Sequence, residues 1–256
     1  MRIDVYWTPA EVERAMLHDR VVVVIDVLRA ATSVTVAIAN GARAVVPTES
    51  TEDALRLVHS LGRDEVLLCG ERQGVRIEGF DLGNSPAEFA PAVVRDRTLV
   101  MTTTNGTGAL VAASGARLAF ITAFVNLSAA ARAVAALDED IVILCAGREG
   151  TVSADDALCA GLIVVEAMEA RGHEPIELND GAVAALALAR QQGSDLAEFL
   201  RRTAAGRALE NIGRGEDVEF CSRRDSVPEL PVLRNRQITR AATGALEDPA
   251  PRGGAR

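Results

Sequence analysis

The stretch that decides the fold is Val21-Val22-Val23-Val24-Ile25-Asp26-Val27-Leu28-Arg29-Ala30-Ala31-Thr32. Five β-branched residues run unbroken into an aspartate, and so short and apolar a run predicts a strand buried on both faces of a parallel sheet. Asp26 then stands at the carboxyl end of that strand, where ligands bind in open α/β sheets. Arg29 follows three residues later, where a helical pattern begins. Together Asp26 and Arg29 form either a site for a cation and an anion or an ion pair that stabilises the turn.

The composition of the chain excludes several classes of function. With 256 residues, 48% of them hydrophobic, the chain can bury a large core. A net charge of −9 argues against nucleic acid or an anionic membrane as the main partner. All 27 basic residues are arginine, so no Schiff-base lysine and no P-loop lysine is present.

The cysteines and histidines give no metal-binding or targeting signal. Four cysteines and three histidines lie far apart, and neither a CxxC nor an HExxH motif is present, so we expect no zinc site. The apolar runs are too short for a membrane span, and the first residues do not resemble a signal peptide. We therefore expect a cytoplasmic protein with reduced thiols.

Strands and helices alternate along the first two thirds of the sequence. Apolar runs predict further strands at 2–7, 44–46, 66–69, 99–101, 119–121 and 141–145. Capping residues and helical periodicity predict helices at 8–17, 30–40, 50–62, from 85, up to 115, from 126 or 128 to 137, 153–171, 181–190, 194–202 and 204–212. A short strand is expected at 217–221.

This alternation predicts an α/β fold, layered α/β/α, with a largely parallel or mixed sheet. We expect one catalytic domain over 1–240, or two intertwined subdomains at about 1–125 and 126–240, followed by a disordered tail at 244–256. Residues 22–46 and 98–121 share the order strand, polar turn, helix, Gly-Ala-Arg, strand. Duplicated βαβ units would make Asp26 and the turn after residue 101 face one cleft.

Polar turns follow four of the predicted strands. Three of them carry charged residues, Asp26 with Arg29, Glu71 with Arg72, and Arg148 with Glu149. The fourth, Thr102-Thr103-Thr104-Asn105-Gly106-Thr107-Gly108, is rich in hydroxyl groups and glycine and runs into a helix, a pattern that favours anion binding. The long polar loop between 73 and 84 is also of a length that is more often functional than not.

The charged groups of these turns suit one kind of chemistry. Several carboxylates with few histidines favour a hard cation, Mg²⁺ rather than Zn²⁺. Several arginines favour an oxyanion such as phosphate, carboxylate or sulfonate. Together they indicate Mg²⁺-assisted hydrolysis of a small anionic ester, although each residue taken alone could equally stabilise a turn.

Three familiar site types do not match the sequence. A haloacid-dehalogenase-type phosphatase needs a second acid two residues after the aspartate, where Leu28 stands, and its lysine is absent. A cysteine phosphatase needs arginine six residues after the cysteine, where Cys145 is followed by Thr151. A dinucleotide-binding turn needs a third glycine where Val111 stands.

Five motifs in order, between about residues 20 and 235, resemble those of the 2-phosphosulfolactate phosphatase family. They are Asp26-Val27-Leu28-Arg29-Ala30, Gly70-Glu71-Arg72, residues 78–86, residues 102–107 and residues 145–150. The resemblance implies an α/β, Mg²⁺-dependent phosphatase that converts 2-phosphosulfolactate to sulfolactate, a step toward coenzyme M. Ala31 and Gln73 depart from the expected threonine and glycine.

Chemistry then suggests a role for each matching residue. The catalytic candidates are Asp26, Arg29, Glu71, Arg148 and Glu149. The Mg²⁺-ligand candidates are Asp26, Glu71 and Asp81. The substrate-binding candidates are Arg72, Asn84, Ser85, Thr103, Thr104, Asn105, Gly106 and Thr107.

The favoured interpretation is a Mg²⁺-dependent phosphatase for a small phosphorylated sulfonate or hydroxy acid. Two alternatives stay open, a non-catalytic protein that binds small anions or assembles on the same fold, and a Mg²⁺-dependent lyase. We expect a small anionic substrate, no nucleic acid and no membrane as partners, and leave a homodimer open.

Overall fold

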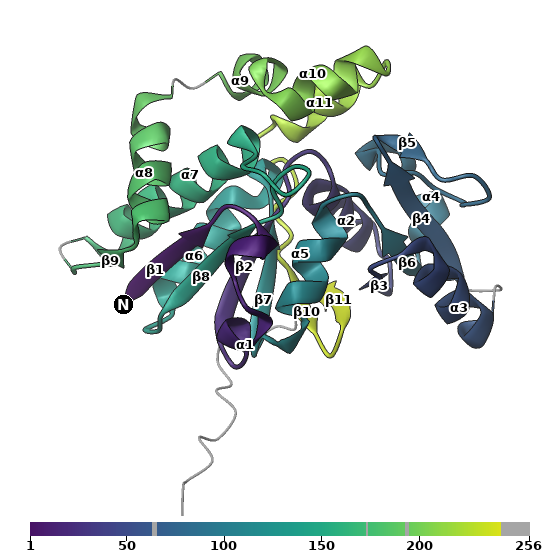
Figure 1. The fold of residues 1–256 in the computed structure, drawn as a ribbon, viewed down its shortest axis with the longest axis horizontal. Helices are drawn as coiled ribbons and strands as arrows, with labels where there is room; N and C mark the ends of the chain where they lie inside the picture. The colour runs from purple at the N-terminus through teal and green to yellow at the C-terminus, as the bar shows by residue number, and fades with distance from the viewer. Residues whose placement is uncertain (63–65, 173, 193–194, 242–256) are drawn as a thin grey trace, which may run out of the picture.

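The computed structural model describes residues 1–62, 66–172, 174–192 and 195–241. In these ranges eleven strands form one mixed sheet with helices on both sides (Figure 1), which confirms the predicted layered α/β fold. The strands are β1 (Arg2–Tyr6), β2 (Val21–Ile25), β3 (Ala44–Pro47), β4 (Val66–Arg72), β5 (Val75–Arg76), β6 (Thr98–Thr102), β7 (Leu118–Thr122), β8 (Ile141–Cys145), β9 (Glu177–Leu178), β10 (Pro231–Arg234) and β11 (Gln237–Arg240). The predicted tail at 244–256 lies outside the described residues, and the division into domains stays a prediction.

The helices of the described ranges are α1 (Arg14–Leu17), α2 (Ala30–Ala39), α3 (Thr51–Leu61), α4 (Pro91–Val94), α5 (Gly106–Ala112), α6 (Leu127–Ala136), α7 (Ala154–Arg171), α8 (Asp180–Gln191), α9 (Leu196–Arg202), α10 (Ala204–Asn211) and α11 (Gly215–Cys221). Among the helices, α2, α3, α7, α8 and α10 begin within one residue of their predicted starts, whereas α1 and α4 begin six residues after the capping residues Thr8 and Ser85. At α3 the Ser50 hydroxyl accepts a hydrogen bond from the Asp53 amide at 3.0 Å, as the sequence predicts. In the described ranges no helix combines the length and the apolar character of a membrane span.

The sheet consists of two largely parallel parts joined by a hairpin, with β5 antiparallel to β4 at one edge. Its strand order is β5-β4-β6-β3-β11-β10-β7-β2-β8-β1-β9. The hairpin β10–β11 comes from the end of the described chain and pairs antiparallel with β7 on one side and β3 on the other. As predicted, β2 lies between two parallel neighbours, β7 and β8, and all five of its residues are buried.

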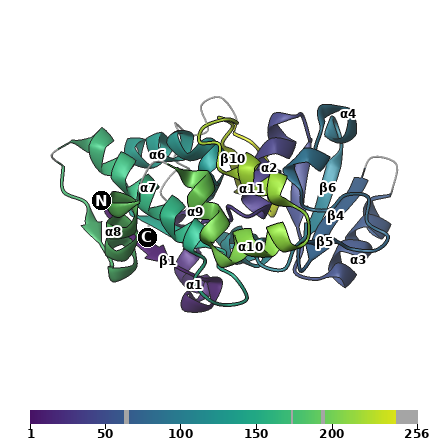
Figure 2. The ribbon, with the colours of Figure 1, turned by 90° about the horizontal axis from the view of Figure 1, so that it is seen from above.

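Two long crossovers interleave the two parts. The chain passes from β2 through α2 to β3, and from β6 through α5 to β7. Because β2 pairs with β7 and β3 pairs with β6, each of the two similar units gives one strand to each part of the sheet. Residues that follow β2 and β6 line one pocket, so the expected shared cleft is present. Above this pocket, α9, α10 and α11 form a separate group of helices (Figures 1 and 2).

The predicted strand at 217–221 is wrong, because this segment is helix α11. Val218 and Cys221, three residues apart, are buried together with Asp217, a spacing that places buried side chains on one helical face. The hairpin β10–β11 was not predicted. Its turn is Asn235-Arg236, both with positive φ (50° and 63°), and it contains none of the glycine that marks such turns in a sequence.

The strand predicted at 66–69 continues to Arg72 in β4. Gln73 and Gly74 then have φ of 53° and 82° and form a two-residue hairpin turn to β5. Glu71 therefore belongs to a strand and not to a strand-end turn. The helices predicted from Thr8 and Ser85 begin as single 3₁₀ turns, at Pro9–Glu11 and Pro86–Glu88.

Candidate active site

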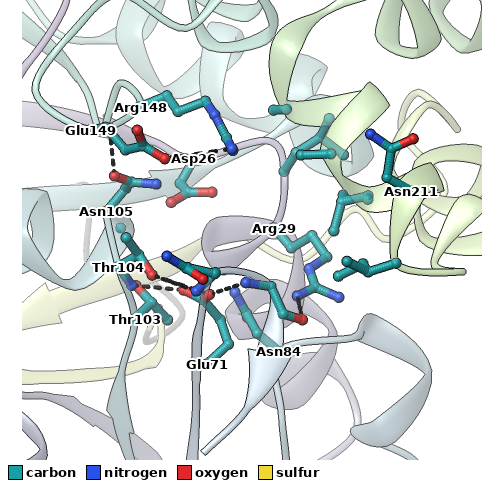
Figure 3. A pocket seen from close by; sticks show the side chains of 18 residues that line it. Asp26, Arg29, Glu71, Asn84, Thr103, Thr104, Asn105, Arg148, Glu149 and Asn211 are labelled. Atoms are coloured by element: carbon teal, nitrogen blue, oxygen red, sulfur yellow. Dashed lines mark hydrogen bonds and ion pairs between the residues drawn. The ribbon is translucent and has the colours of Figure 1, made fainter.

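A cavity of about 320 Å³ lies between the polar ends of the strands and α10 (Figure 3). Its lining comprises Asp26, Leu28, Arg29, Glu71, Gln73, Gly74, Asn84, Thr103, Thr104, Asn105, Gly106, Arg148, Glu149, Ala205, Ala208, Leu209, Asn211 and Ile212. We call this cavity the strand-end pocket. It brings together residues from all four predicted polar turns, which lie far apart in the sequence.

Asp26 lies in this pocket between Arg148 and Glu71 (Figure 3). Its Oδ1 accepts a hydrogen bond from the Ala30 amide at 2.9 Å, at the start of α2. Burial raises the pKa of Asp26 to about 7, although the hydrogen bond from Ala30 lowers it. The negative charges of Asp155 and Glu71 raise this pKa further. Asp26 therefore changes its protonation state near neutral pH.

Two further aspartates, Asp155 and Asp156 of α7, are buried near Asp26; the sequence places them among the charged groups near the polar turns but assigns them no individual role. Asp156 accepts hydrogen bonds from the Val27 amide at 2.9 Å and the Gly147 amide at 3.0 Å. It thus joins the segment after β2 to the segment after β8. Burial raises the pKa of both carboxyls. The sequence signal for them was the acidic start of a helix directly after a polar turn.

Glu71 holds the two turns on the other side of the pocket. Its Oε1 accepts from the Thr104 amide at 2.7 Å, and its Oε2 accepts from the Gly74 amide at 2.6 Å and the Thr104 hydroxyl at 3.2 Å. Gly74 lies close to α10, because a Cβ atom there would approach Ile212 Cδ1 to 2.6 Å. The carboxylate of Glu71 therefore lines the pocket and also fixes its wall.

The threonine-rich turn is organised by reciprocal hydrogen bonds at the start of α5. The Thr103 amide donates to the Thr107 hydroxyl and the Thr107 amide donates to the Thr103 hydroxyl, each at 3.0 Å. Gly106 lies between these two threonines, and a Cβ atom there would lie 2.3 Å from Asp26 Oδ2. Only glycine lets α5 approach the aspartate so closely.

Arg148 and Glu149 form the opposite rim. Glu149 has a positive φ of 50°, and its amide donates to Asn105 Oδ1 at 2.9 Å. Arg148 Nη2 lies 3.6 Å from Glu149 Oε1, and the guanidinium remains partly exposed to the pocket. This guanidinium is therefore accessible to an anion.

Arg29 is almost fully buried. Its Nη1 donates to Asp217 Oδ2 of α11 at 2.6 Å, and its Nη2 donates to the Gly74 carbonyl at 2.8 Å. Asp217 also accepts a hydrogen bond from the Ser85 hydroxyl at 2.5 Å. Asp217 was not a predicted site residue, and no local sequence signal marks it.

Four predicted site residues lie outside the pocket lining. Arg72 donates to Thr102 and to the carbonyl of Glu71, and Asp81 Oδ2 accepts from the Leu68 amide at 2.8 Å. Ser85 contacts Asp217, and Thr107 lies in the first turn of α5, where its amide donates to the Thr103 hydroxyl. Asn84 does line the pocket, and its buried Oδ1 has no hydrogen-bond partner among the described residues. The roles of these residues stay predictions.

One wall of the pocket is apolar and was not anticipated. It comes from α10 and the residue after it, and consists of Ala205, Ala208, Leu209 and Ile212. The sequence predicted the helix at 204–212 from its periodicity, but periodicity does not reveal what a helix packs against. This wall places apolar side chains in the same pocket as the charged groups.

The oxygen atoms of the pocket are compatible with a hard cation. Mg²⁺ commonly binds one or two protein carboxylates together with water and substrate oxygens. Asp26 and Glu71 line the pocket, and Oδ2 of Asp26 accepts no hydrogen bond from the described residues. Within the described ranges no three His, Cys, Asp or Glu side chains converge to hold a metal ion. The donor set therefore fits a cation that shares its coordination with substrate oxygens.

Comparison with known proteins agrees with this arrangement. The family described as 2-phosphosulpholactate phosphatase matches residues 6–236. The chain belongs to this family. The resemblance found in the sequence is thereby confirmed, and the family takes its name from phosphatases, which are phosphoric monoester hydrolases.

Relatives named probable 2-phosphosulfolactate phosphatase span nearly the whole chain. The protein from Symbiobacterium thermophilum is 40% identical over 222 residues, 87% of this chain and 94% of its own length. That from Caldanaerobacter subterraneus subsp. tengcongensis is 37% identical over 235 residues, 92% of this chain and 96% of its own length. That from Clostridium beijerinckii is 33% identical over 239 residues, 93% of this chain and 99% of its own length.

Proposed function

We propose that this protein is a Mg²⁺-dependent phosphatase that hydrolyses 2-phosphosulfolactate, or a similar small phosphorylated hydroxy acid, to the alcohol and phosphate. The observation that carries the proposal is the meeting of Asp26 with Arg29 and Arg148 in one strand-end pocket. Family membership and the names of the relatives support it. A place in coenzyme M biosynthesis and a cytoplasmic location stay predictions.

The arginines supply the binding of the anionic groups. Arg148 lies at the open rim and Arg29 at the buried end, so a substrate with two anionic groups can contact both. The amides and hydroxyls of the threonine-rich turn offer further hydrogen bonds. With a substrate bound, the apolar wall of α10 would exclude water from these electrostatic contacts and so strengthen them.

Asp26 and Glu71 would hold the Mg²⁺ ion, whose positive charge would stabilise charge on the phosphoryl oxygens. A cation beside Asp26 favours its ionised form and so opposes the effect of burial on its pKa. Without a cation, Asp26 holds a proton up to about neutral pH. In hydrolysis the ester P–O bond breaks, water adds to phosphorus, and the released alcohol gains a proton.

The test is the release of inorganic phosphate from racemic 2-phosphosulfolactate, with Mg²⁺ and with EDTA. We expect release that requires Mg²⁺. No release from folded protein would contradict the proposal and favour the anion-binding alternative. Mg²⁺-dependent consumption of the substrate without free phosphate would favour the lyase.

A further inference from the structure

The buried end of the strand-end pocket contains an arginine that already has an anionic partner. Arg29 and Asp217 meet at 2.6 Å, with side chains that are 3% and 7% exposed. The second oxygen of Asp217 accepts from Ser85, and a second Arg29 nitrogen donates to the Gly74 carbonyl. Asp217 therefore joins α11, the segment after β2 and the loop before Pro86 at one point.

This arrangement has two physical consequences for Arg29. First, the guanidinium is fixed in position, because two of its nitrogens have partners on separate elements. Second, its positive charge is balanced by a carboxylate in a setting where water screens little. An anion that enters the pocket thus meets a well-placed donor whose net attraction is reduced.

We propose that Asp217 is a positioning residue that fixes Arg29 and lowers the affinity of the pocket for inorganic phosphate, the product. The inference rests on the proposed phosphatase function. A site that binds its product too tightly releases it slowly, so balancing one arginine favours turnover over binding. A purely structural ion pair predicts something different. Its loss should destabilise the protein and weaken phosphate binding or leave it unchanged.

The test compares phosphate binding by calorimetry in D217N, D217E and the unaltered protein, in Mg²⁺-free buffer. The amide of D217N keeps an oxygen for Ser85 but removes the charge opposite Arg29. We expect its phosphate Kd to fall by on the order of tenfold or more, and its kcat to fall because Arg29 is no longer held. D217E keeps the charge and should restore the original phosphate Kd.

A matched control lies two residues further along α11. Glu219 pairs with Arg201 at 2.6 Å on the exposed side of the helix, so E219Q also removes one negative charge from α11 and breaks an ion pair of equal length. We expect its phosphate Kd and kcat to match those of the unaltered protein. If E219Q tightens phosphate binding as D217N does, the effect is one of overall charge and the proposal is overturned.

The outcome is separable from that of the proposed function. Turnover of the unaltered protein tests the phosphatase, whereas the ratio of phosphate Kd values tests Asp217 without any turnover. If phosphate binding to the unaltered protein is too weak to detect, the proposal requires that binding to D217N be detectable. A phosphate Kd in D217N that is unchanged, higher or still undetectable overturns the inference. Should D217N not fold, the smaller neutral variant D217S must lower the phosphate Kd in its place, and an unchanged or higher Kd in D217S overturns the inference.

Discussion

The two sides of the strand-end pocket differ in whether their buried charged side chains form ion pairs. On one side Asp26, Asp155 and Asp156 lie together, and none of them forms an ion pair with a described residue. On the other side Arg29 and Asp217 form a buried pair. Burial raises the pKa of all three aspartates of the first group, which we call the aspartate cluster. Carboxyls without a direct ion-pair partner respond to protons and cations, whereas a matched pair keeps its charge and fixes geometry.

The largest expected effect comes from removing the pocket-facing member of the aspartate cluster. Asp26→Asn keeps an oxygen for the Ala30 amide but loses the charge that would hold Mg²⁺. We expect Mg²⁺-dependent phosphate release to fall by about a thousandfold or more. Circular dichroism should show an intact fold. Full activity would remove Asp26 from the catalytic residues.

The next effect tests how closely α5 must approach Asp26. Gly106→Ala places a Cβ atom 2.3 Å from Asp26 Oδ2 and 2.5 Å from Ala30 Cβ, so something must shift. We expect phosphate release to fall about a hundredfold. Gly108→Ala is the matched control, because Gly108 lies in the same helix with nothing within 4 Å of an added Cβ. It should keep its activity and gain about 0.5–1 kcal/mol of stability. Equal losses in the two variants would disprove this account.

Several elements with a strong local signal are correct, although the capping boxes at Thr8 and Ser85 begin only single 3₁₀ turns. The strand of valines before Asp26, the strand at 141–145 and the helix from Ser153 follow from apolar runs and caps, and the structure has them at β2, β8 and α7. The strand end at Asp26 also predicted where the pocket lies. The other features of the pocket depend on contacts between residues that are far apart in the sequence. Asp217 lies in the site through its contact with Arg29, which is 188 residues away in the sequence. The α10 residues become a wall of the pocket because the end of this helix packs against Gly74.

A smaller effect concerns stability against pH in the absence of Mg²⁺. The folded protein holds a proton on Asp26 up to a pKa of about 7, whereas the unfolded chain releases it near pH 4. The folded state thus binds more protons in this window, and its stability should fall as pH rises from 4 to 7, by up to about 1.4 kcal/mol per pH unit. Urea unfolding at several pH values measures the slope. Asp26→Asn should reduce the slope, the remainder coming from Asp155 and Asp156, whose pKa values burial also raises; an equal slope in the variant would assign the effect elsewhere.

The smallest effect separates the members of the aspartate cluster. The charge of Asp155 helps to raise the pKa of Asp26, and the Ser153 hydroxyl donates to Asp155 at 2.5 Å. Asp155→Asn removes the charge but keeps an oxygen for Ser153. The acid limb of the pH–rate profile should move to lower pH, with activity retained at pH 8. A shift to higher pH would show that Asp155 acts on Asp26 in some other way.

The interleaved crossovers have a consequence for how this protein folds. Because β2 pairs with β7 and β3 with β6, neither part of the sheet is complete until both chain crossovers are in place. Such long-range pairing makes folding slow relative to a chain with local contacts. The strand-end pocket takes residues from both parts of the sheet, so we expect an anion bound there to stabilise only the structure in which both parts have formed. Phosphate binding can then be used to measure complete folding. Separated halves of the chain should bind no phosphate.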